Sequence, residues 1–248
     1  CARPGCGARE GGGGAEGARR GYEGAYRRTA TGGVGVAGGP VEVRARVEGG
    51  DMLRPQAGRV VGFGRDGRLP RAAETDDDGV ATVRFTPKGP GDLAFVADVS
   101  SAGMPDEPPR PQVLTVTCRA ATTPMVIVDL DKTIVASGFH TVLIGDPKSM
   151  PSSAGVLTKL ARTHTVVYLT HRPDYFGLKS KQWLWENEYP KGPLLLSSIS
   201  GFLKGSGAYK TEVLRNLVSR FRNIKTGIGD TVSDAVAYHE NGMRAGPY

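Results

Sequence analysis

Two aspartates stand directly after an apolar run in the second half of this 248-residue chain. Asp129 and Asp131 follow the sequence MVIV, and Thr133 comes next on the same parity. In an extended or loop conformation this spacing aims both carboxylates to one side. Convergent carboxylates are groups that transfer protons and hold hard cations. An isolated pair of this kind, however, is more often an ordinary loop or helix cap.

The pair is not isolated, because polar residues also stand at the ends of later apolar runs and at the start of a helical stretch. Thr170 ends an apolar run in YLTHR, and Lys210 opens the helical stretch YKTEVL. Asp230 and Asp234 lie in GDTVSD, after a further apolar run. In open α/β sheets, ligands bind beyond the carboxyl ends of the strands. We therefore expect these four polar elements to meet at one site.

The elements that must position these residues begin at Thr122, where the hydrophobic pattern changes. From there, apolar runs typical of strands buried on both faces alternate with amphipathic stretches typical of helices. The expected strands begin at Met125 and cover 165–170, 193–198 and 223–230, and the expected helices cover 153–162, 176–185 and 209–221. This alternation predicts an α/β fold with a doubly wound parallel sheet over residues 122–248.

The first half of the chain follows a different pattern, in which short alternating runs are broken by turn residues. The runs lie at 41–47, 59–63, 79–85, 92–99 and 112–118. They predict a small all-β sandwich over residues 40–120. The stretch from Thr75 to Val99 resembles bacterial immunoglobulin-like modules. Residues 1–38 are rich in glycine and lack any period, so we expect a flexible segment there.

As they stand in this chain, the four polar elements resemble the four motifs of the haloacid dehalogenase-like (HAD) phosphohydrolase superfamily. These motifs are an apolar strand followed by DxDxT, a second apolar strand ending in Thr, a later Lys, and GDxxxD, and the match spans residues 125–244. Within the superfamily, the segments WLWENEYPKGPLLLSS and IGDTVSDAVAYHENGM are similar to the phosphatidate-directed domain shared by lipins and Nir-type phosphatidylinositol transfer proteins.

The resemblance implies a Mg²⁺-dependent phosphatase. Asp129 would be the nucleophile that forms an aspartyl phosphate, because a bridging cation offsets its repulsion from the phosphate. Asp131 would protonate the leaving alkoxide and then activate water. Thr170 would donate a hydrogen bond to the phosphoryl group, and Lys210 would balance its charge. The implied metal ligands are Asp129, Asp230 with the support of Asp234, and the backbone carbonyl of Asp131.

Three further residues are candidates for contact with the substrate. Thr133 belongs to the first motif, and His171 and Arg172 follow Thr170 at the end of a strand. His171 and Arg172 there are placed to touch a phosphate or its headgroup, although a solvated loop pair explains them equally well.

The spacing of the motifs bears on the kind of substrate. Asp131 and Thr170 are 39 residues apart and Thr170 and Lys210 are 40 apart, which leaves no room for the large cap domain of many HAD enzymes. The resemblance then implies an open cleft and a bulky substrate, with phosphatidate or another lipid phosphate as the leading expectation. The alternatives are a non-catalytic phosphatidate-binding module and a HAD phosphatase that acts on phosphoproteins or nucleic-acid ends.

The charge of the chain permits several phosphate-bearing partners. The net charge is +7, and residues 122–248 carry 15 Lys+Arg against 10 Asp+Glu, a net of +5. This excess attracts phosphates, anionic membrane surfaces or nucleic acid without choosing among them. No apolar run approaches the roughly 18 residues of a membrane-spanning helix, so we expect at most a peripheral membrane contact. The sequence leaves the oligomeric state open.

The cysteines and the two ends of the chain bear on its cellular location. Three cysteines without metal-ligand spacing support neither a disulfide framework nor a zinc site, and Cys118 is expected to be buried. Cys1 followed by a glycine-rich stretch has the form of a processed bacterial lipoprotein, hence a cell-envelope or secreted protein. The alternative is a fragment, which leaves a cytoplasmic location open. A HAD sheet would usually continue into another strand beyond HENGMRAG, so we expect truncation near Tyr248.

Overall fold

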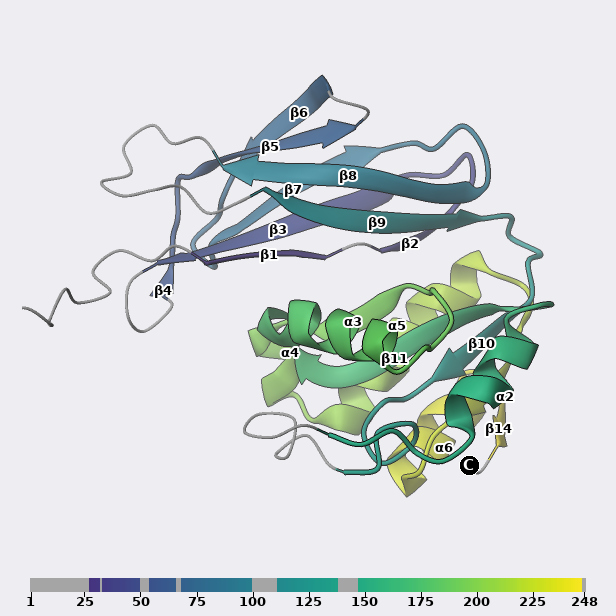
Figure 1. Ribbon diagram of the computed structural model, residues 1–248. Coiled ribbons are helices and arrows are strands. Elements are labelled where there is room, and N and C mark those ends of the chain that lie inside the picture. The colour runs from purple at the N-terminus through teal and green to yellow at the C-terminus, as the bar shows by residue number, and fades with distance from the viewer. Residues whose placement is uncertain are drawn as a thin grey trace, which may run out of the picture.

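The structure is a computed structural model that describes residues 27–31, 33–49, 54–65, 68–99, 111–137 and 147–246. Within these residues, a unit made only of strands lies beside a unit in which helices surround a sheet (Figure 1). The all-β unit comes first in the chain, and the mixed α/β unit begins at Met125. The expectation of a β-sandwich followed by an α/β unit is confirmed at this level.

The all-β unit is a sandwich of two sheets. One sheet contains β1 (Arg27–Thr31), β3 (Val41–Gly49), β4 (Arg54–Pro55) and β7 (Val80–Phe85). The other runs in the order β2 (Val34–Val36), β9 (Gln112–Arg119), β8 (Gly91–Val99), β5 (Val60–Arg65) and β6 (Arg68–Glu74). Alternate residues of the strands point inward, and Phe63, Phe95 and the buried Cys118 lie in the single core between the sheets.

The expectation of a flexible segment over residues 1–38 is corrected at its C-terminal end. β1 pairs antiparallel with β3, and β2 pairs parallel with β9, so residues 27–31 and 34–36 belong to the sandwich. Residues 1–26 lie outside the described residues. Local sequence does not reveal β1 and β2, because a short strand with weak propensity is held by hydrogen bonds to a neighbour that is distant in sequence.

The α/β unit is built on one fully parallel sheet. Its strands follow the order β12 (Leu194–Ser197), β11 (Thr165–Pro173), β10 (Met125–Val128), β13 (Ile224–Ile228) and β14 (Arg244–Gly246). All four residues of the central strand β10 are buried, as expected for a strand covered on both faces. β14 lies within the segment HENGMRAG and pairs parallel with β13 at one edge of the sheet.

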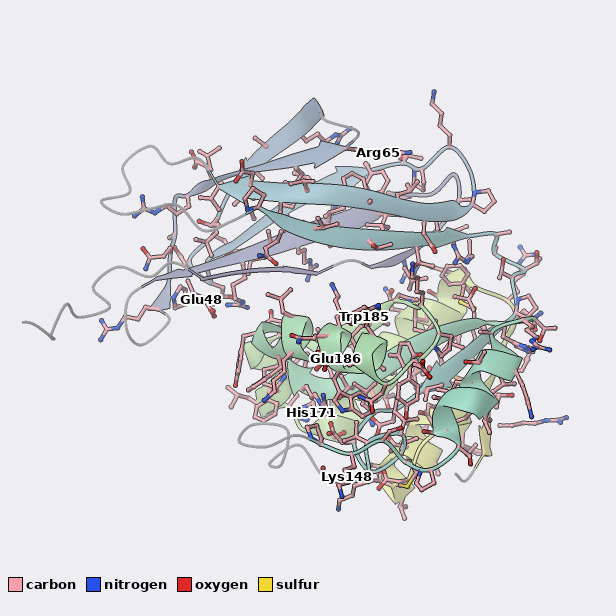
Figure 2. All side chains as sticks on the ribbon, in the orientation of Figure 1. Glu48, Arg65, Lys148, His171, Trp185 and Glu186 are labelled. Carbon is pink, nitrogen blue, oxygen red and sulfur yellow. The ribbon has the colours of Figure 1, made fainter. Side chains whose placement is uncertain are left out.

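Helices cover both faces of this sheet. α5 (Ser206–Arg220) and α6 (Val232–Glu240) pack on one face, and α2 (Ser153–Leu160) and α3 (Gly177–Glu186) pack on the other. On α3, Trp183 is 5% exposed and stacks on Tyr189. Trp185, on the same helix, is labelled in Figure 2. Its side chain is 75% exposed. A parallel sheet with helices on both faces confirms the doubly wound arrangement in outline.

The connections that follow the carboxyl ends of β11 and β12 are short. β11 continues through the single turn η1 (Asp174–Phe176) into α3, and β12 is followed by α4 (Ile199–Leu203) and α5. From Pro147 to Gly246 no inserted domain interrupts the α/β pattern. Among the helices of the described residues, none combines the length and apolarity that crossing a membrane requires.

Candidate active site

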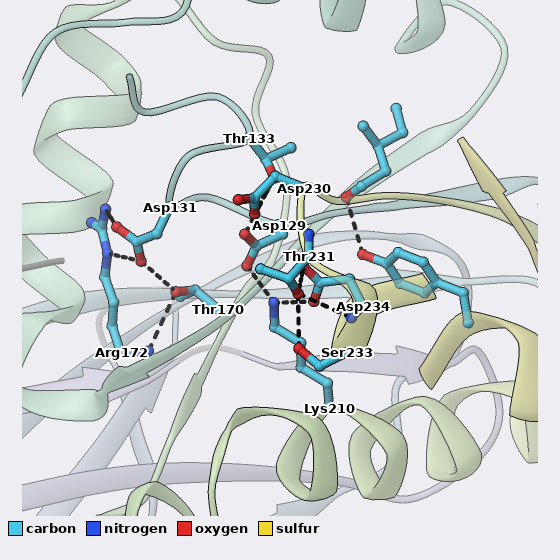
Figure 3. Close-up of polar contacts among 12 residues, drawn as sticks. Asp129, Asp131, Thr133, Thr170, Arg172, Lys210, Asp230, Thr231, Ser233 and Asp234 are labelled. Atoms are coloured by element: carbon cyan, nitrogen blue, oxygen red, sulfur yellow. Dashed lines mark hydrogen bonds and ion pairs between the residues drawn. The ribbon is translucent and has the colours of Figure 1, made fainter. Parts of the chain in front are cut away.

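The sequence-predicted residues other than His171 meet at the carboxyl edge of the parallel sheet (Figure 3). Asp129 directly follows β10, and its backbone N–H donates to the carbonyl of Ile228 at the end of β13, at 2.9 Å. Thr170 lies in β11, and Asp230 follows β13. Because parallel strands end at the same edge, residues far apart in sequence are brought together there.

Lys210 lies between two aspartates in the interior of the site. Its Nζ donates to Asp129 Oδ1 at 2.7 Å and also to Asp234 Oδ1, and all three side chains are buried. Lys210 comes from α5 and Asp234 from the first turn of α6, which pack on the same face of the sheet. The site therefore holds a fixed cation beside the predicted nucleophile.

Burial governs the ionisation of Asp129. It raises the pKa of Asp129 to about 7, although Lys210 favours the ionised form. The nearby Asp234 and Asp131 add to the increase, because like charges disfavour one another. Burial also opposes the charged form of Lys210, but Asp129 and Asp234 outweigh it and raise the pKa of the lysine. Further positive charge at this place would favour ionised Asp129.

Three carboxylates form a group that fits a hard divalent cation. Asp129, Asp230 and Asp234 each offer an oxygen within 4.8 Å of the others. Asp230 is exposed at the open edge of the sheet, whereas Asp234 is buried. Mg²⁺ takes oxygen ligands and keeps several of its waters, so a few carboxylates beside an open edge match its chemistry. The carboxylate of Asp131 is not part of this group.

Asp234 is anchored by a capping box at the start of α6. Its Oδ2 accepts hydrogen bonds from the backbone N–H of Thr231 at 3.3 Å and from the Thr231 hydroxyl at 2.7 Å. The Thr231 hydroxyl in turn accepts from the backbone N–H of Asp234 at 3.1 Å. The other carboxylate oxygen of Asp234, Oδ1, accepts from Lys210. Asp234 thus suits the supporting role that was expected of it.

Thr133 connects two members of the carboxylate group. It is fully buried, and its hydroxyl lies 3.3 Å from Asp129 Oδ2 and 3.4 Å from Asp230 Oδ1. A hydroxyl shared in this way orients both carboxylates. The contacts of Thr133 are therefore with the predicted metal ligands.

Asp131 faces the other side of the site, where it binds Arg172. Arg172 donates from Nε to Asp131 Oδ2 at 2.9 Å and from Nη2 to Asp131 Oδ1 at 2.7 Å. Its Nη1 donates to Ser180 Oγ at 3.0 Å, and the Thr170 hydroxyl lies 3.3 Å from Asp131 Oδ2. A two-point ion pair fixes the orientation of the carboxylate as well as its place.

The structure separates the two residues that follow Thr170. Arg172 is buried and points inward to Asp131. It therefore lies in the site and is not the solvated loop residue of the alternative expectation. His171 is partly buried, stacks on Phe202 with ring centroids 4.8 Å apart, and lies 3.4 Å from the carbonyl of Gly201. Burial lowers the pKa of His171, and nearby Lys210 adds to the effect. His171 is not brought into contact with the aspartates.

Sequence reasoning missed two supporting residues of the site. Thr231 carries a readable signal, because Thr-x-x-Asp directly before a helix is the pattern of a capping box. Ser180 carries none, because its contact with Arg172 depends on how α3 packs against β11.

A family model described as "PITM 1-3, LNS2 domain" matches residues 126–246, just under half of the chain. The matched segment contains every predicted site residue. The match agrees with the resemblance to lipin and Nir-type domains and supports, at a coarse level, a phosphatase-type domain. None of the curated protein sequences matches the chain.

Several solved structures are similar to part of the chain. "Structure of the Pnkp1/Rnl/Hen1 RNA repair complex" is 14% identical with a TM-score of 0.46, and covers 52% of this chain and 43% of that one. The "D0-D1 domain of Intimin" is 19% identical with a TM-score of 0.29, and covers 41% and 56%. Invasin, titled a bacterial integrin-binding protein, is 19% identical with a TM-score of 0.29, and covers 42% and 23%. This chain thus spans less than two thirds of each, and no TM-score reaches 0.5.

Proposed function

We propose that the α/β unit is a Mg²⁺-dependent HAD-type phosphatase that forms an aspartyl phosphate on Asp129. The observation that carries the proposal is the surroundings of this one carboxylate. Asp129 has a buried lysine on one oxygen, a group of three carboxylates suited to a cation, and a second aspartate two residues away on an arginine. A nucleophile, a source of positive charge and an acid–base group are the parts that phosphoryl transfer by a carboxylate requires.

In this proposal Asp129, Asp230 and Asp234 hold the metal. When bound, Mg²⁺ supplies positive charge that offsets the repulsion between a carboxylate and a phosphate. One Asp129 oxygen forms a bond to phosphorus while the bond from phosphorus to the leaving oxygen breaks. Lys210 keeps its proton throughout, because two carboxylates raise its pKa, and it balances charge beside the nucleophile.

Asp131 handles the protons of both steps. It gives a proton to the leaving alkoxide as the aspartyl phosphate forms. It then takes a proton from the water that attacks the aspartyl phosphate, which releases inorganic phosphate and restores Asp129. The Thr170 hydroxyl and the two-point contact with Arg172 hold the Asp131 carboxylate at the sheet edge for both transfers.

We further propose a lipid phosphate such as phosphatidate as the substrate, with peripheral contact to an anionic membrane. Three observations support it. The described connections from Pro147 to Gly246 contain no domain that would enclose the site, and the family model matched is the LNS2 domain. The net charge of +5 over residues 122–248 favours an anionic surface. Phosphoproteins and phosphorylated nucleic-acid ends share the phosphate chemistry and are outcomes of the test.

The test is a hydrolysis panel with the full chain. Phosphatidate in mixed micelles, a phosphopeptide, and 3′- and 5′-phosphorylated oligonucleotides are each assayed for phosphate release. The assays are run with Mg²⁺, with EDTA, and with Ca²⁺ in place of Mg²⁺. We expect release from phosphatidate that EDTA removes, that Mg²⁺ restores and that Ca²⁺ restores poorly because of its looser coordination. Activity that survives exhaustive chelation would contradict the metal, and faster release from an oligonucleotide or peptide would contradict the lipid.

One observation favours a second candidate, a phosphatidate-binding module without turnover. Both oxygens of Asp131 are already held by Arg172, so the carboxylate serves a structural purpose whether or not it transfers protons. Asp131→Asn separates the candidates. An enzyme loses about 10²–10⁴-fold in turnover but still sediments with phosphatidate vesicles in Mg²⁺, since a general acid contributes little to binding. A binder shows no hydrolysis in the wild type, and the variant changes nothing.

We also propose that the chain divides at residues 119–124, between β9 and β10. The sandwich core and the two cores of the α/β unit contain different residues on either side of this connection, except for Val34 and Val36 of β2. Limited proteolysis of the full chain, followed by N-terminal sequencing, is expected to release a stable fragment that begins in this range. Early cleavage inside 147–246 with survival of the sandwich would contradict the division.

A further inference from the structure

We infer that Arg46 of the sandwich is a positioning residue for Asp131, acting through Asp174 and the end of β11. The inference rests on the proposed function of Asp131. It gives the sandwich a role in the reaction, because Arg46 and Asp174 are 128 residues apart in the chain and are nevertheless joined side chain to side chain.

The contact itself is buried at the junction of the two units. Arg46 lies on β3, and it donates from Nε and from Nη2 to Asp174 Oδ2, each at 3.2 Å. Its Nη1 donates to the carbonyl of Asp78 at 2.8 Å, which fixes the guanidinium on the sandwich. The Arg46 side chain is buried and Asp174 is partly buried. A buried arginine held at both ends is a rigid connection between its partners.

Asp174 is close in the chain to the residue that holds Asp131. It begins η1 directly after β11, and Arg172, two residues earlier, binds both oxygens of Asp131. Pro173 stands between them, and its ring restricts the backbone rotation that would separate the two. A displacement of Asp174 is therefore passed to Arg172 over one constrained residue.

The end of β11 needs such support because its pairing with β12 is irregular. The register between these strands shifts between Leu169 and Pro173, which is the stretch that contains Thr170 and Arg172. Ser197 of β12 holds the backbone there, since its hydroxyl donates to the carbonyl of His171 at 3.0 Å. Where ladder hydrogen bonds are interrupted, side-chain contacts determine where the backbone lies.

A cavity of about 1000 Å³ lies between the sandwich and α5, and both Arg46 and Asp174 line it. Two other contacts across the junction lie elsewhere: Arg119 Nε donates to Thr165 Oγ1 at the start of β11, at 3.0 Å, and Arg220 donates to the carbonyl of Val34 at 3.2 Å. The pair of Arg46 and Asp174 lies at the carboxyl end of β11, where the chemistry is proposed.

Asp174 depends on this arginine for its own pairing. Its Oδ2 accepts both bonds from Arg46, and its Oδ1 is buried without a hydrogen-bond partner among the described residues. Removal of the Arg46 guanidinium would leave both carboxylate oxygens of Asp174 without a hydrogen-bond donor in the described part of the chain. An unpaired buried carboxylate is unfavourable, which favours movement of η1 toward water. We therefore expect loss of Arg46 to loosen residues 170–176 more than the rest of the α/β unit.

The test compares leaving groups in the full chain. Hydrolysis of p-nitrophenyl phosphate needs little help from a general acid, whereas phenyl phosphate has a poorer leaving group that needs a proton. For Arg46→Met we expect kcat/KM for phenyl phosphate to fall about 10–100-fold, which is part of the rate acceleration that a general acid supplies. We expect kcat/KM for p-nitrophenyl phosphate to fall much less. Arg44→Met is the matched control, because Arg44 lies on the same strand, is exposed and pairs with Glu42. It is expected to leave both values unchanged.

Two further measurements separate positioning from general stability. Amide hydrogen exchange is expected to speed up over 170–176 in Arg46→Met but not over the central strand β10. Asp174→Asn is expected to give the same leaving-group dependence, and the double variant no more than either change alone, because both remove one contact. Arg46→Lys keeps the positive charge but lacks the paired donors of the guanidinium, and it replaces Arg46→Met in the test if that variant fails to fold. Its kcat/KM for phenyl phosphate is expected to lie between those of the wild type and Arg46→Met.

The outcomes distinguish this inference from the function on which it rests. A wild type that hydrolyses neither ester with Mg²⁺ overturns the proposed phosphatase, and the positioning role of Arg46 with it. A wild type that hydrolyses both, together with an Arg46→Met chain that loses both equally or neither, overturns the positioning role and leaves the phosphatase standing. Unchanged exchange over 170–176 also overturns it.

Discussion

The sandwich and the α/β unit each hold one charged side chain between two of opposite sign, the first at the surface and the second in the interior. In the sandwich, Glu42 accepts from Arg44 at 2.6 Å and from Arg84 at 2.7 Å. The side chains of Glu42, Arg44 and Arg84 are 33%, 60% and 75% exposed. Water and salt screen such a cluster, so it contributes little to stability.

The corresponding group of the α/β unit has the signs reversed and is buried. Lys210 donates to Asp129 and Asp234, and the three side chains are 4%, 5% and 1% exposed. Removal of charges from water costs several kcal/mol for each ion, and good geometry only offsets that cost. A protein gains little stability from such a cluster compared with an apolar core, so its presence at the sheet edge supports a chemical purpose.

The two clusters shift carboxylate pKa values in opposite directions. The hydrogen bonds from Arg44 and Arg84 lower the pKa of Glu42, and they outweigh its slight burial, which acts in the opposite direction. Burial raises the pKa of Asp129 to about 7 in spite of Lys210. The same kind of ion pair therefore favours opposite protonation states according to how far it is removed from water.

The largest expected effect is on turnover in Asp129→Asn. The amide keeps the shape of the side chain but cannot attack phosphorus, so hydrolysis of p-nitrophenyl phosphate is expected to disappear. Circular dichroism should remain that of the wild type. Asp92→Asn, a change of the same kind on the sandwich at a half-exposed residue, is the control and should keep full activity. Wild-type turnover by Asp129→Asn would show that the nucleophile is another group.

The next effect is the loss of stability in Lys210→Met. With the lysine removed, two buried carboxylates face each other without a cation, and the free energy of unfolding is expected to fall by about 3–5 kcal/mol. Arg84→Met removes a cation from the exposed cluster and is expected to cost about 0–1 kcal/mol. Urea unfolding of both variants without metal measures the contrast. Equal losses would mean that burial does not separate the two clusters.

A smaller effect links pH to the metal. The pKa of Asp129 is raised from 3.8 to about 7 on folding, so between these values the folded chain keeps a proton that the unfolded chain has released. The free energy of unfolding therefore falls as pH rises through this window. Mg²⁺ must displace the proton, so the rise in Tm that it causes should be larger at pH 8 than at about pH 5.5.

Asp129→Asn is the control for this pH effect, since it removes both the proton and the ligand. Thermal unfolding with and without Mg²⁺ at the two pH values gives the measurement. A Tm increase that is the same at both would show that Mg²⁺ does not compete with a proton on Asp129.

The smallest effect is expected for Glu42→Gln. The exposed cluster contributes about 0–1 kcal/mol, and added salt should remove most of that difference. Because the pKa of Glu42 is lowered in the folded chain, its contribution is present above the pKa of the unfolded chain and lost as pH falls. Urea unfolding at low and high salt tests this. A salt-independent loss of several kcal/mol would place Glu42 among the buried charges instead.

The sequence alone determined the arrangement of the α/β unit and the identity of its central residues. Buried runs such as β10, followed directly by Asp129, are local patterns, and parallel strands end at one edge whatever the details of packing. The meeting of Asp129 with Lys210 and Asp234 could therefore be predicted from the order of the strands. The periods of strands and helices are properties of the backbone, which is why sequence carries them.

The tertiary structure alone decided which way side chains turn and what lies across the junction. His171 and Arg172 are neighbours in sequence, yet only Arg172 turns inward to Asp131, because Ser180 of α3 receives its free end. The pairing of Arg46 with Asp174 joins residues 128 positions apart and leaves no local pattern. Such contacts depend on how completed elements pack against each other, and packing is a property of the folded chain as a whole.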